Sequence, residues 1–254
     1  MKNLRKLSIF SLMVMGMALV SLGVANAGPL TIYGIDGDWA NVAGGWNVEI
    51  ENDQAPDGRL SVVSWGDEYH WFWNPNPMRS SYEFLSAATP FDPELDGSVF
   101  ALGDFTHNNF PIPLGSGIRG VDLLVDLGIT GFGPVTATFE FSHNETPNTP
   151  GNPGDEASRD IVTLVNPIVN RWFSDGVNEY YFHLFGFSQD GGTTLSNEFY
   201  TWENRVNTAT LYGSITSEAI PTFPEPVPEP STLLLLGGGL GMLGLAGARR
   251  KLKK

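Results

Sequence analysis

Short runs of alternating apolar and polar residues constrain the fold of this chain more than any other feature. In "VTATFEF" (135–141), a valine, an alanine and two phenylalanines fall on one side, and two threonines and a glutamate on the other. A period of two is typical of a strand with one buried face in an antiparallel sheet. Residues 28–216 contain no long run with the 3.6-residue period of an amphipathic helix. The pattern therefore predicts an all-β fold.

Other β-rich runs with turn signals between them extend this pattern. The turn signals are "APDG" (55–58), "NPNP" (74–77), "SDG" (174–176) and "QDGG" (189–192), and the 30 glycines and 18 prolines agree with many turns. Many short strands indicate a sandwich or a barrel, and we expect an antiparallel two-sheet β-sandwich of jelly-roll type. No change in composition divides residues 28–216, which we predict to form one domain. The β-rich runs are Arg59–Trp65, Gly120–Leu127, Asp160–Val165, Glu179–Phe187 and Thr208–Thr216.

The first 27 residues have the pattern of a secretory signal peptide. Three basic residues, Lys2, Arg5 and Lys6, precede an apolar run from Leu7 to Val24. Ala25 and Ala27 then supply the small side chains that signal peptidase requires, so we expect cleavage after Ala27. The alternative is an uncleaved N-terminal anchor.

The charge between the signal peptide and the basic C-terminus is strongly negative. Six arginines stand against all 28 acidic residues of the chain, which leaves a formal charge of −22. Such a surface has no basic patch for nucleic acid, so no nucleic-acid partner is expected. It should attract divalent cations, calcium in particular, although negative charge also keeps an exported protein soluble. The absence of cysteine excludes disulfides, thiolate metal sites and a cysteine nucleophile.

The C-terminus combines a proline-rich segment with a short apolar run. Residues 217–227 are expected to form a semi-rigid spacer, because the stretch 217–230 holds five prolines. Leu233–Ala248 is a run of sixteen mostly apolar residues, six of them glycine. A helix of that length covers about 24 Å, and the hydrocarbon core of a membrane is about 30 Å thick. We therefore expect a short transmembrane-type helix that is inserted transiently in the inner membrane, with its basic end in the cytoplasm.

The segment "VPEPSTLLLLGGGLGMLGLAGARRK" resembles the PEP-CTERM sorting signal of Gram-negative bacteria, which we assign to residues 228–254. Pro228, Glu229, Pro230 and Ser231 match its Pro-Glu-Pro motif, and Arg249 and Arg250 match its arginine cluster. The resemblance implies processing by an exosortase and a location in the cell envelope, on the outer surface or outside the cell. It also implies exopolysaccharide as a second expected partner.

The middle of the chain is similar to domains of the choice-of-anchor K type. The similarity spans most of residues 34–216 and implies a β fold on a bacterial surface protein, without implying an activity or catalytic residues. It rests on "ALGDFTHNNFPI" (101–112), "FEFSHNETPN" (139–148), "DIVTLV", "YYFHLFGF" and "FYTWENRVNTATLYGSIT" (199–216).

Three polar segments are candidates for a ligand site. We expect them in loops or at strand ends, and carboxylate and amide oxygens in loops are suitable calcium ligands. If the segments meet at one edge of the sandwich, they can form a single site with Glu145 and Glu203 as its charged members. The alternative is that the polar side chains cap turns. The candidates are His107 and Asn109 in "FTHN", Glu145 and Asn148 in "HNETPN", which also holds His143, Asn144 and Thr146, and Glu203 and Asn207 in "TWENRVN".

Two further clusters have alternative interpretations. The segment "WGDEYHWFWNPNP" carries Trp65, Trp71 and Trp73, with Tyr69 and Phe72 between them. These rings can stack on sugars, or they can pack in the core, which we expect more because buried aromatic rings stabilise a fold strongly. In "GIDGDW" (34–39), Asp36 and Asp38 lack the spacing of an EF-hand, and we expect a turn there.

Sequence signatures of common enzymes are missing. The chain contains no HExxH, no G-x-S-x-G and no phosphate-binding glycine loop. We therefore expect a non-enzymatic surface or matrix protein. A calcium- or polysaccharide-binding module is the main alternative, and calcium is the only cofactor that the sequence suggests. A secreted hydrolase that uses Glu145 and Glu203 is a weaker alternative.

Overall fold

The computed structural model describes residues 30–54, 57–67, 78–146 and 156–220, and these residues form twelve strands and one short 3₁₀ turn, η1. The bounds are β1 Ile32–Gly44, β2 Glu49–Gln54, β3 Leu60–Trp65, β4 Ser80–Ser86, β5 Phe100–Asn109, β6 Ile118–Ile129, β7 Val135–Asn144, η1 Glu156–Ser158, β8 Asp160–Leu164, β9 Asn170–Ser174, β10 Glu179–Ser188, β11 Glu198–Thr201 and β12 Arg205–Thr216.

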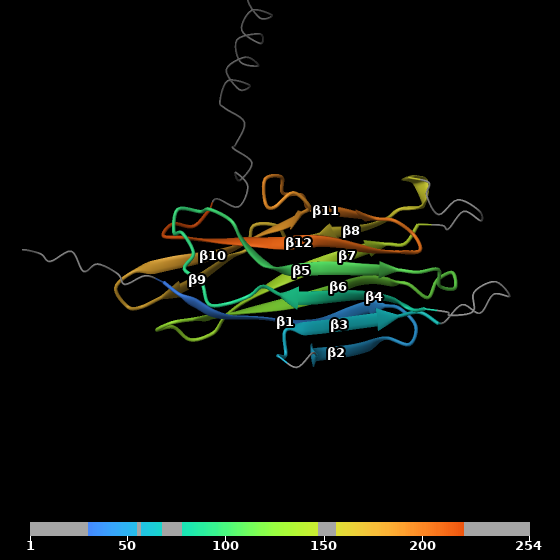
Figure 1. Cartoon of the computed structure of the whole chain (residues 1–254), viewed down its shortest axis with the longest axis horizontal. Helices are drawn as coiled ribbons and strands as arrows, with labels where there is room; N and C mark the ends of the chain where they lie inside the picture. Colours follow the sequence, from blue (N-terminus) through green and yellow to red (C-terminus); the bar gives the residue numbers. More distant parts are fainter. Residues whose placement is uncertain (1–29, 55–56, 68–77, 147–155, 221–254) are drawn as a thin grey trace, which may run out of the picture.

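The strands form two sheets in which neighbouring strands are antiparallel. One sheet has five strands in the order β1-β6-β7-β8-β11, and the other has seven in the order β2-β3-β4-β5-β12-β10-β9. Figure 1 shows the strands of both sheets running along the long axis of the molecule. The predicted antiparallel two-sheet sandwich is confirmed.

The core lies between the two sheets and is rich in aromatic residues. Along β7 every second side chain faces inward, as the period of two predicted. The Phe105 ring of β5 lies 5.3 Å from that of Phe141 in β7, and 5.3 Å from that of Phe187 in β10. Trp39 of β1 packs against Tyr82 of β4 across the same layer. Burial of one such side chain contributes about 1.5–3 kcal/mol, so these rings are a main source of stability in a chain without disulfides.

All six runs predicted as strands coincide with observed strands, namely β3, β6, β7, β8, β10 and β12. The turn predicted over residues 34–39 is wrong, because this segment lies inside β1, with Asp36 and Asp38 on its outer face. Gly37 faces the core there, where an added Cβ would lie 2.3 Å from the ring of Phe84. Glycine is therefore needed for close packing rather than for a turn. Among the described residues, β2, β4, β5, β9 and β11 form strands that the pattern did not predict.

Several strands begin or end at one end of the sandwich. Trp65 at the end of β3 pairs with Ser80 at the start of β4, Asn109 pairs with Arg205, and Thr201 pairs with Asp160. We call this the cluster end; Figure 1 shows β3 and β5 both pointing towards it, at the right of the view. At the opposite end, β1 begins with Ile32 paired to Ile129, and β12 ends at Thr216.

The predicted sorting segments fall outside the described part. The signal peptide, residues 1–27 with Ala25 and Ala27, precedes it, and most of the proline-rich spacer and the whole segment 228–254 follow it. Within residues 30–220, as far as the structure describes them, no helix has the length and apolar character needed to cross a membrane.

Candidate metal centre between the two sheets

The inward-facing row of β7 ends in a histidine. After Phe139 and Phe141, the next inward side chain is His143, and it is buried. The hydroxyl oxygen of Tyr82, on β4 of the opposite sheet, lies 2.5 Å from Nδ1 of His143. His143 is therefore held in place by a hydrogen bond from one sheet to the other.

The second ring nitrogen of His143 faces a carboxylate. Nε2 lies 3.0 Å from Oε2 of Glu145, which follows β7 by one residue and is partly exposed. Burial raises the pKa of the Tyr82 phenol well above its usual value, and the negative charges of Asp160 and Glu145 raise it further. Tyr82 therefore stays protonated, and it can donate to Nδ1 or accept from it according to the tautomer of His143.

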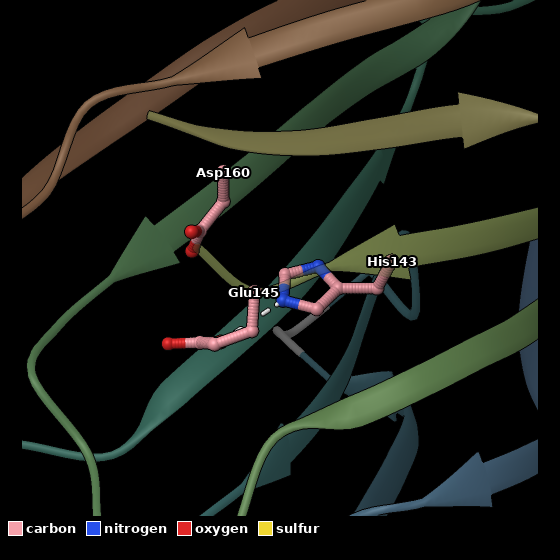
Figure 2. A group of neighbouring side chains, drawn as sticks. All are labelled: His143, Glu145 and Asp160. Atoms are coloured by element: carbon pink, nitrogen blue, oxygen red, sulfur yellow. Dashed lines mark hydrogen bonds and ion pairs between the residues drawn. The ribbon is translucent and has the colours of Figure 1, made fainter. Parts of the chain in front are cut away.

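A second carboxylate faces the same space from β8. Asp160 is the first residue of β8 and is buried; its Oδ1 accepts hydrogen bonds from the backbone N–H (2.8 Å) and the hydroxyl (3.2 Å) of Thr146. Its Oδ2 has no hydrogen-bond partner among the described residues. Burial, followed by the charge of Glu145, raises the pKa of Asp160 to about 6. Figure 2 shows the Asp160 side chain extending towards Glu145, and the ligand atoms of both residues lie within 4.8 Å of a His143 ring nitrogen.

These three side chains form a ligand set for a cation. One ligand atom each from His143, Glu145 and Asp160 lies within 4.8 Å of the other two. In the described part of the chain, no arginine forms an ion pair with either carboxylate. Two neighbouring carboxylates and an imidazole nitrogen can together bind one divalent ion.

A second row of buried polar residues lies next to this set. Nδ1 of His107 lies 2.8 Å from the hydroxyl of Thr201, and that hydroxyl also accepts a 3.5 Å hydrogen bond from Asn109. Within the described residues, Nε2 of His107 and Oδ1 of Asn109 have no partner. Burial and the neighbouring His143 lower the pKa of His107 well below its usual value, so the ring is neutral. Trp65 packs on His107 at 5.8 Å between ring centroids.

The structure brings the three predicted segments together at the cluster end, but it changes the roles of their residues. His107 and Asn109 lie at the end of β5, which is one of the two predicted locations. Both side chains face the core, because the inward row of β5 continues to the last residue of the strand. Asn207 stabilises the turn between β11 and β12, where its side chain accepts from the N–H of Trp202 (2.8 Å) and donates to the carbonyl of Trp202 (3.0 Å). Glu203 is buried in the same turn. Asn148 lies outside the described residues.

The prediction missed the contributions of Tyr82, His143 and Asp160. His143 was present in the quoted segment, and extending the alternation of "VTATFEF" by two residues would have placed it on the inner face. Asp160 opens a β-rich run and begins its inward row. No signal in the sequence pairs Tyr82 with His143, because the two are 61 positions apart and lie in different sheets.

The tryptophan-rich segment is a core element where the structure describes it. Trp65 is fully buried, as expected for core packing, and therefore cannot stack on a sugar. Tyr69, Trp71, Phe72 and Trp73 lie outside the described residues.

A different aromatic surface lies beside β11 and the start of β12. It lines an open groove of about 680 Å³ that includes Tyr200, Trp202, Arg159 and Arg205. The guanidinium of Arg159 lies 5.0 Å from the centroids of both the Tyr200 and Trp202 rings, and that of Arg205 lies 5.7 Å from Trp202. We call this surface the Trp202 groove.

A second acidic group, Asp36, Asp38 and Asp53, lies on the outside of β1 and β2. Its ligand atoms are also within 4.8 Å of one another, but Asp53 is exposed and the other two are only half-buried. Burial raises the pKa of both Asp36 and Asp38, and the neighbouring carboxylates raise it further. This group contains no nitrogen ligand.

The family model of the PEP-CTERM protein-sorting motif matches residues 226–251. This match agrees with the motif residues Pro228, Glu229, Pro230 and Ser231, and with Arg249 and Arg250. The motif implies an exported, cell-surface protein that an exosortase processes. No curated protein matches the chain at a significant level.

Proposed function

We propose that this protein is a non-enzymatic protein displayed on the outer surface of the cell or in the extracellular matrix. The observation that carries this proposal is the sorting motif at residues 226–251, which begins shortly after the last strand ends at Thr216. An exosortase is the partner that processes this tail, after transient insertion of the apolar segment 233–248 in the inner membrane.

The direction of β12 supports display of the cluster end. Arg205 starts β12 at that end, and Thr216 finishes it at the other. At about 3.3 Å per residue, the two ends of the strand are about 36 Å apart. The chain therefore leaves the sandwich towards its sorting tail at the end remote from His143 and Asp160, so a molecule held by its tail has the cluster end free.

The test of this proposal is the location of a motif variant. Epitope-tagged wild-type protein and the double variant Pro228→Ala, Glu229→Gln are expressed in the native host, and their amounts in the inner membrane, on the cell surface and in the medium are compared. We expect the variant to accumulate in the inner membrane and to be depleted at the surface. Glu218→Gln, an exposed change upstream of the motif, is the control. An unchanged distribution of the motif variant would contradict the proposal.

A second candidate function is polysaccharide binding, with exopolysaccharide as the partner. The Trp202 groove supports it, because Tyr200 and Trp202 offer aromatic faces beside two of the six arginines of the acidic middle section. Aromatic faces stack on the apolar faces of sugar rings, and arginine donates paired hydrogen bonds to carboxylates. In the described residues the groove offers a surface for this function, whereas Trp65 of the tryptophan-rich segment is buried.

The choice-of-anchor K resemblance is part of the same proposal. We assign residues 34–216 to that type of surface domain on the segments quoted above, and the two-sheet fold agrees with it. A calcium role for Glu145 and Glu203 together, or a hydrolytic one, finds less support, because the group of ligand atoms around Glu145 contains His143 and Asp160 instead of Glu203.

A further inference from the structure

We propose that His143, Glu145 and Asp160 form a binding site for a divalent transition-metal ion of the Zn²⁺ type, with Nε2 of His143 as its nitrogen ligand. The site is independent of the sorting tail, since all three residues belong to the β-sandwich.

The orientation of His143 suits metal binding. Its Nδ1 is occupied by the hydroxyl of Tyr82 at 2.5 Å. When Nδ1 carries the proton and donates it to Tyr82, the lone pair of Nε2 faces Glu145 and is free for a metal. Metal-binding histidines commonly have such an outer partner, which fixes both the tautomer and the ring orientation. Tyr82 has this supporting role.

The positions of the two carboxylates favour a bound cation. Glu145 Oε2 lies 3.0 Å from Nε2, close to the separation of two ligands on one small ion. Asp160 is fully buried, and its Oδ2 has no partner among the described residues although its Oδ1 has two. A buried carboxylate oxygen without a hydrogen bond costs free energy, and a metal ion in front of it removes that cost.

The combination of nitrogen and oxygen ligand atoms determines which metal ion the site prefers. Calcium prefers six to eight oxygen ligands, whereas an imidazole with two carboxylates suits zinc and its neighbours in the periodic table. Three protein ligands leave a coordination position for water or a ligand group. The unpartnered Nε2 of His107 and Oδ1 of Asn109 belong to the same buried polar region, where such atoms normally contact ordered water.

The experiment uses the exported protein, freed of metal with a chelator and then dialysed. Zn²⁺ and Ca²⁺ are titrated by calorimetry, and Co²⁺ is titrated by its visible absorption, which reports nitrogen and oxygen ligands in low-coordinate geometry. We expect one Zn²⁺ or Co²⁺ per chain and weaker binding of Ca²⁺. Glu145→Gln and Asp160→Asn should each weaken Zn²⁺ binding by about tenfold or more.

Two matched variants serve as controls. Glu140→Gln changes an exposed glutamate on the outer face of β7, and Asp36→Asn changes the other acidic group; both should leave Zn²⁺ binding unchanged. Near-UV circular dichroism verifies that each variant is folded. A further variant, Tyr82→Phe, removes the hydrogen bond to Nδ1 that orients His143 but leaves all three metal ligands in place. The proposal is overturned if the folded wild-type protein binds neither Zn²⁺ nor Co²⁺ stoichiometrically, if Ca²⁺ binds more tightly, or if both ligand variants bind Zn²⁺ as the controls do.

Discussion

Tyr82 and His143 form a hydrogen bond, 2.5 Å from hydroxyl oxygen to Nδ1, that joins the two sheets of the sandwich through their buried faces. Each residue is next to a phenylalanine in the inward row of its strand: Tyr82 precedes Phe84, and His143 follows Phe141. The hydrogen bond therefore marks the place where the aromatic core gives way to a polar cluster.

Removal of the Tyr82 hydroxyl should destabilise the protein. Tyr82→Phe keeps the ring packing but leaves Nδ1 of His143 buried without a partner, so the free energy of unfolding of the metal-free protein should fall by about 1–3 kcal/mol. Urea unfolding measures this change. Tyr180→Phe is the matched control, because Tyr180 is also buried and its hydroxyl makes no hydrogen bond to the described residues. Equal losses in the two variants would argue against a special role for the hydrogen bond.

The stability of the metal-free protein should depend on the charge of Asp160. Its pKa is about 6 in the folded protein, above the value of about 3.9 for an unfolded chain. The folded state therefore binds the Asp160 proton more tightly than the unfolded state does. The stabilisation of the fold by this proton is fully present below pH ~4 and is lost as the pH rises through ~6. The loss amounts to about 2–3 kcal/mol.

Asp160→Asn should remove this part of the pH dependence. Urea unfolding of metal-free protein at several pH values between pH ~4 and ~7 compares the variant with wild type and with Glu140→Gln. We expect a flatter curve for Asp160→Asn only. A wild-type slope that persists in this variant would show that other groups cause it.

The Trp202 groove predicts a sugar-binding phenotype. Trp202→Ala should weaken binding to exopolysaccharide of the native host by about tenfold, since a stacked aromatic contact contributes about 1 kcal/mol or more. Affinity electrophoresis or calorimetry with the purified polysaccharide measures this. Trp46→Ala removes an exposed tryptophan outside the groove and should have no effect. Wild-type binding that neither substitution changes would exclude the groove as the binding surface.

Phe105 is the centre of the aromatic core, with ring contacts to both sheets. Phe105→Ala should lower the free energy of unfolding by about 3–5 kcal/mol, because it leaves a cavity between the sheets. Val206→Ala, a truncation at an exposed position of β12, should cost little. A loss below about 1 kcal/mol for Phe105→Ala would mean that the core can collapse around the missing ring.

The sequence predicted the strands in which apolar and polar residues alternate clearly. It failed for strands in which other requirements on the residues disturb this alternation. "VTATFEF" identified β7 because its outer positions are polar and its inner positions apolar. β1 was misread because Asp36 and Asp38 on its outer face, together with glycines, imitate a turn. In β5 the inner row itself becomes polar at His107 and Asn109, so the sequence pattern does not distinguish the end of a strand from a loop there.

The sequence predicted the location of the candidate site but not the set of residues that forms it. The three polar segments do meet, because the ends of β5, β7 and β11 share one end of the sandwich. The direction of each side chain decides which atoms of these segments can act as ligands. The sequence indicates that direction only through the alternation of inward-facing and outward-facing residues. Long-range pairing adds Tyr82 from the opposite sheet, and no local pattern contains that information.

The most direct test of export and sorting is the mass of the protein recovered from the cell surface or the medium of its native host. Intact-protein mass spectrometry, with peptide mapping of both ends, determines where the mature chain begins and ends. We predict a chain that begins at Gly28 and ends before the apolar segment 233–248. A chain that retains both Met1 and Lys254, found only in the cytoplasm, would contradict the account.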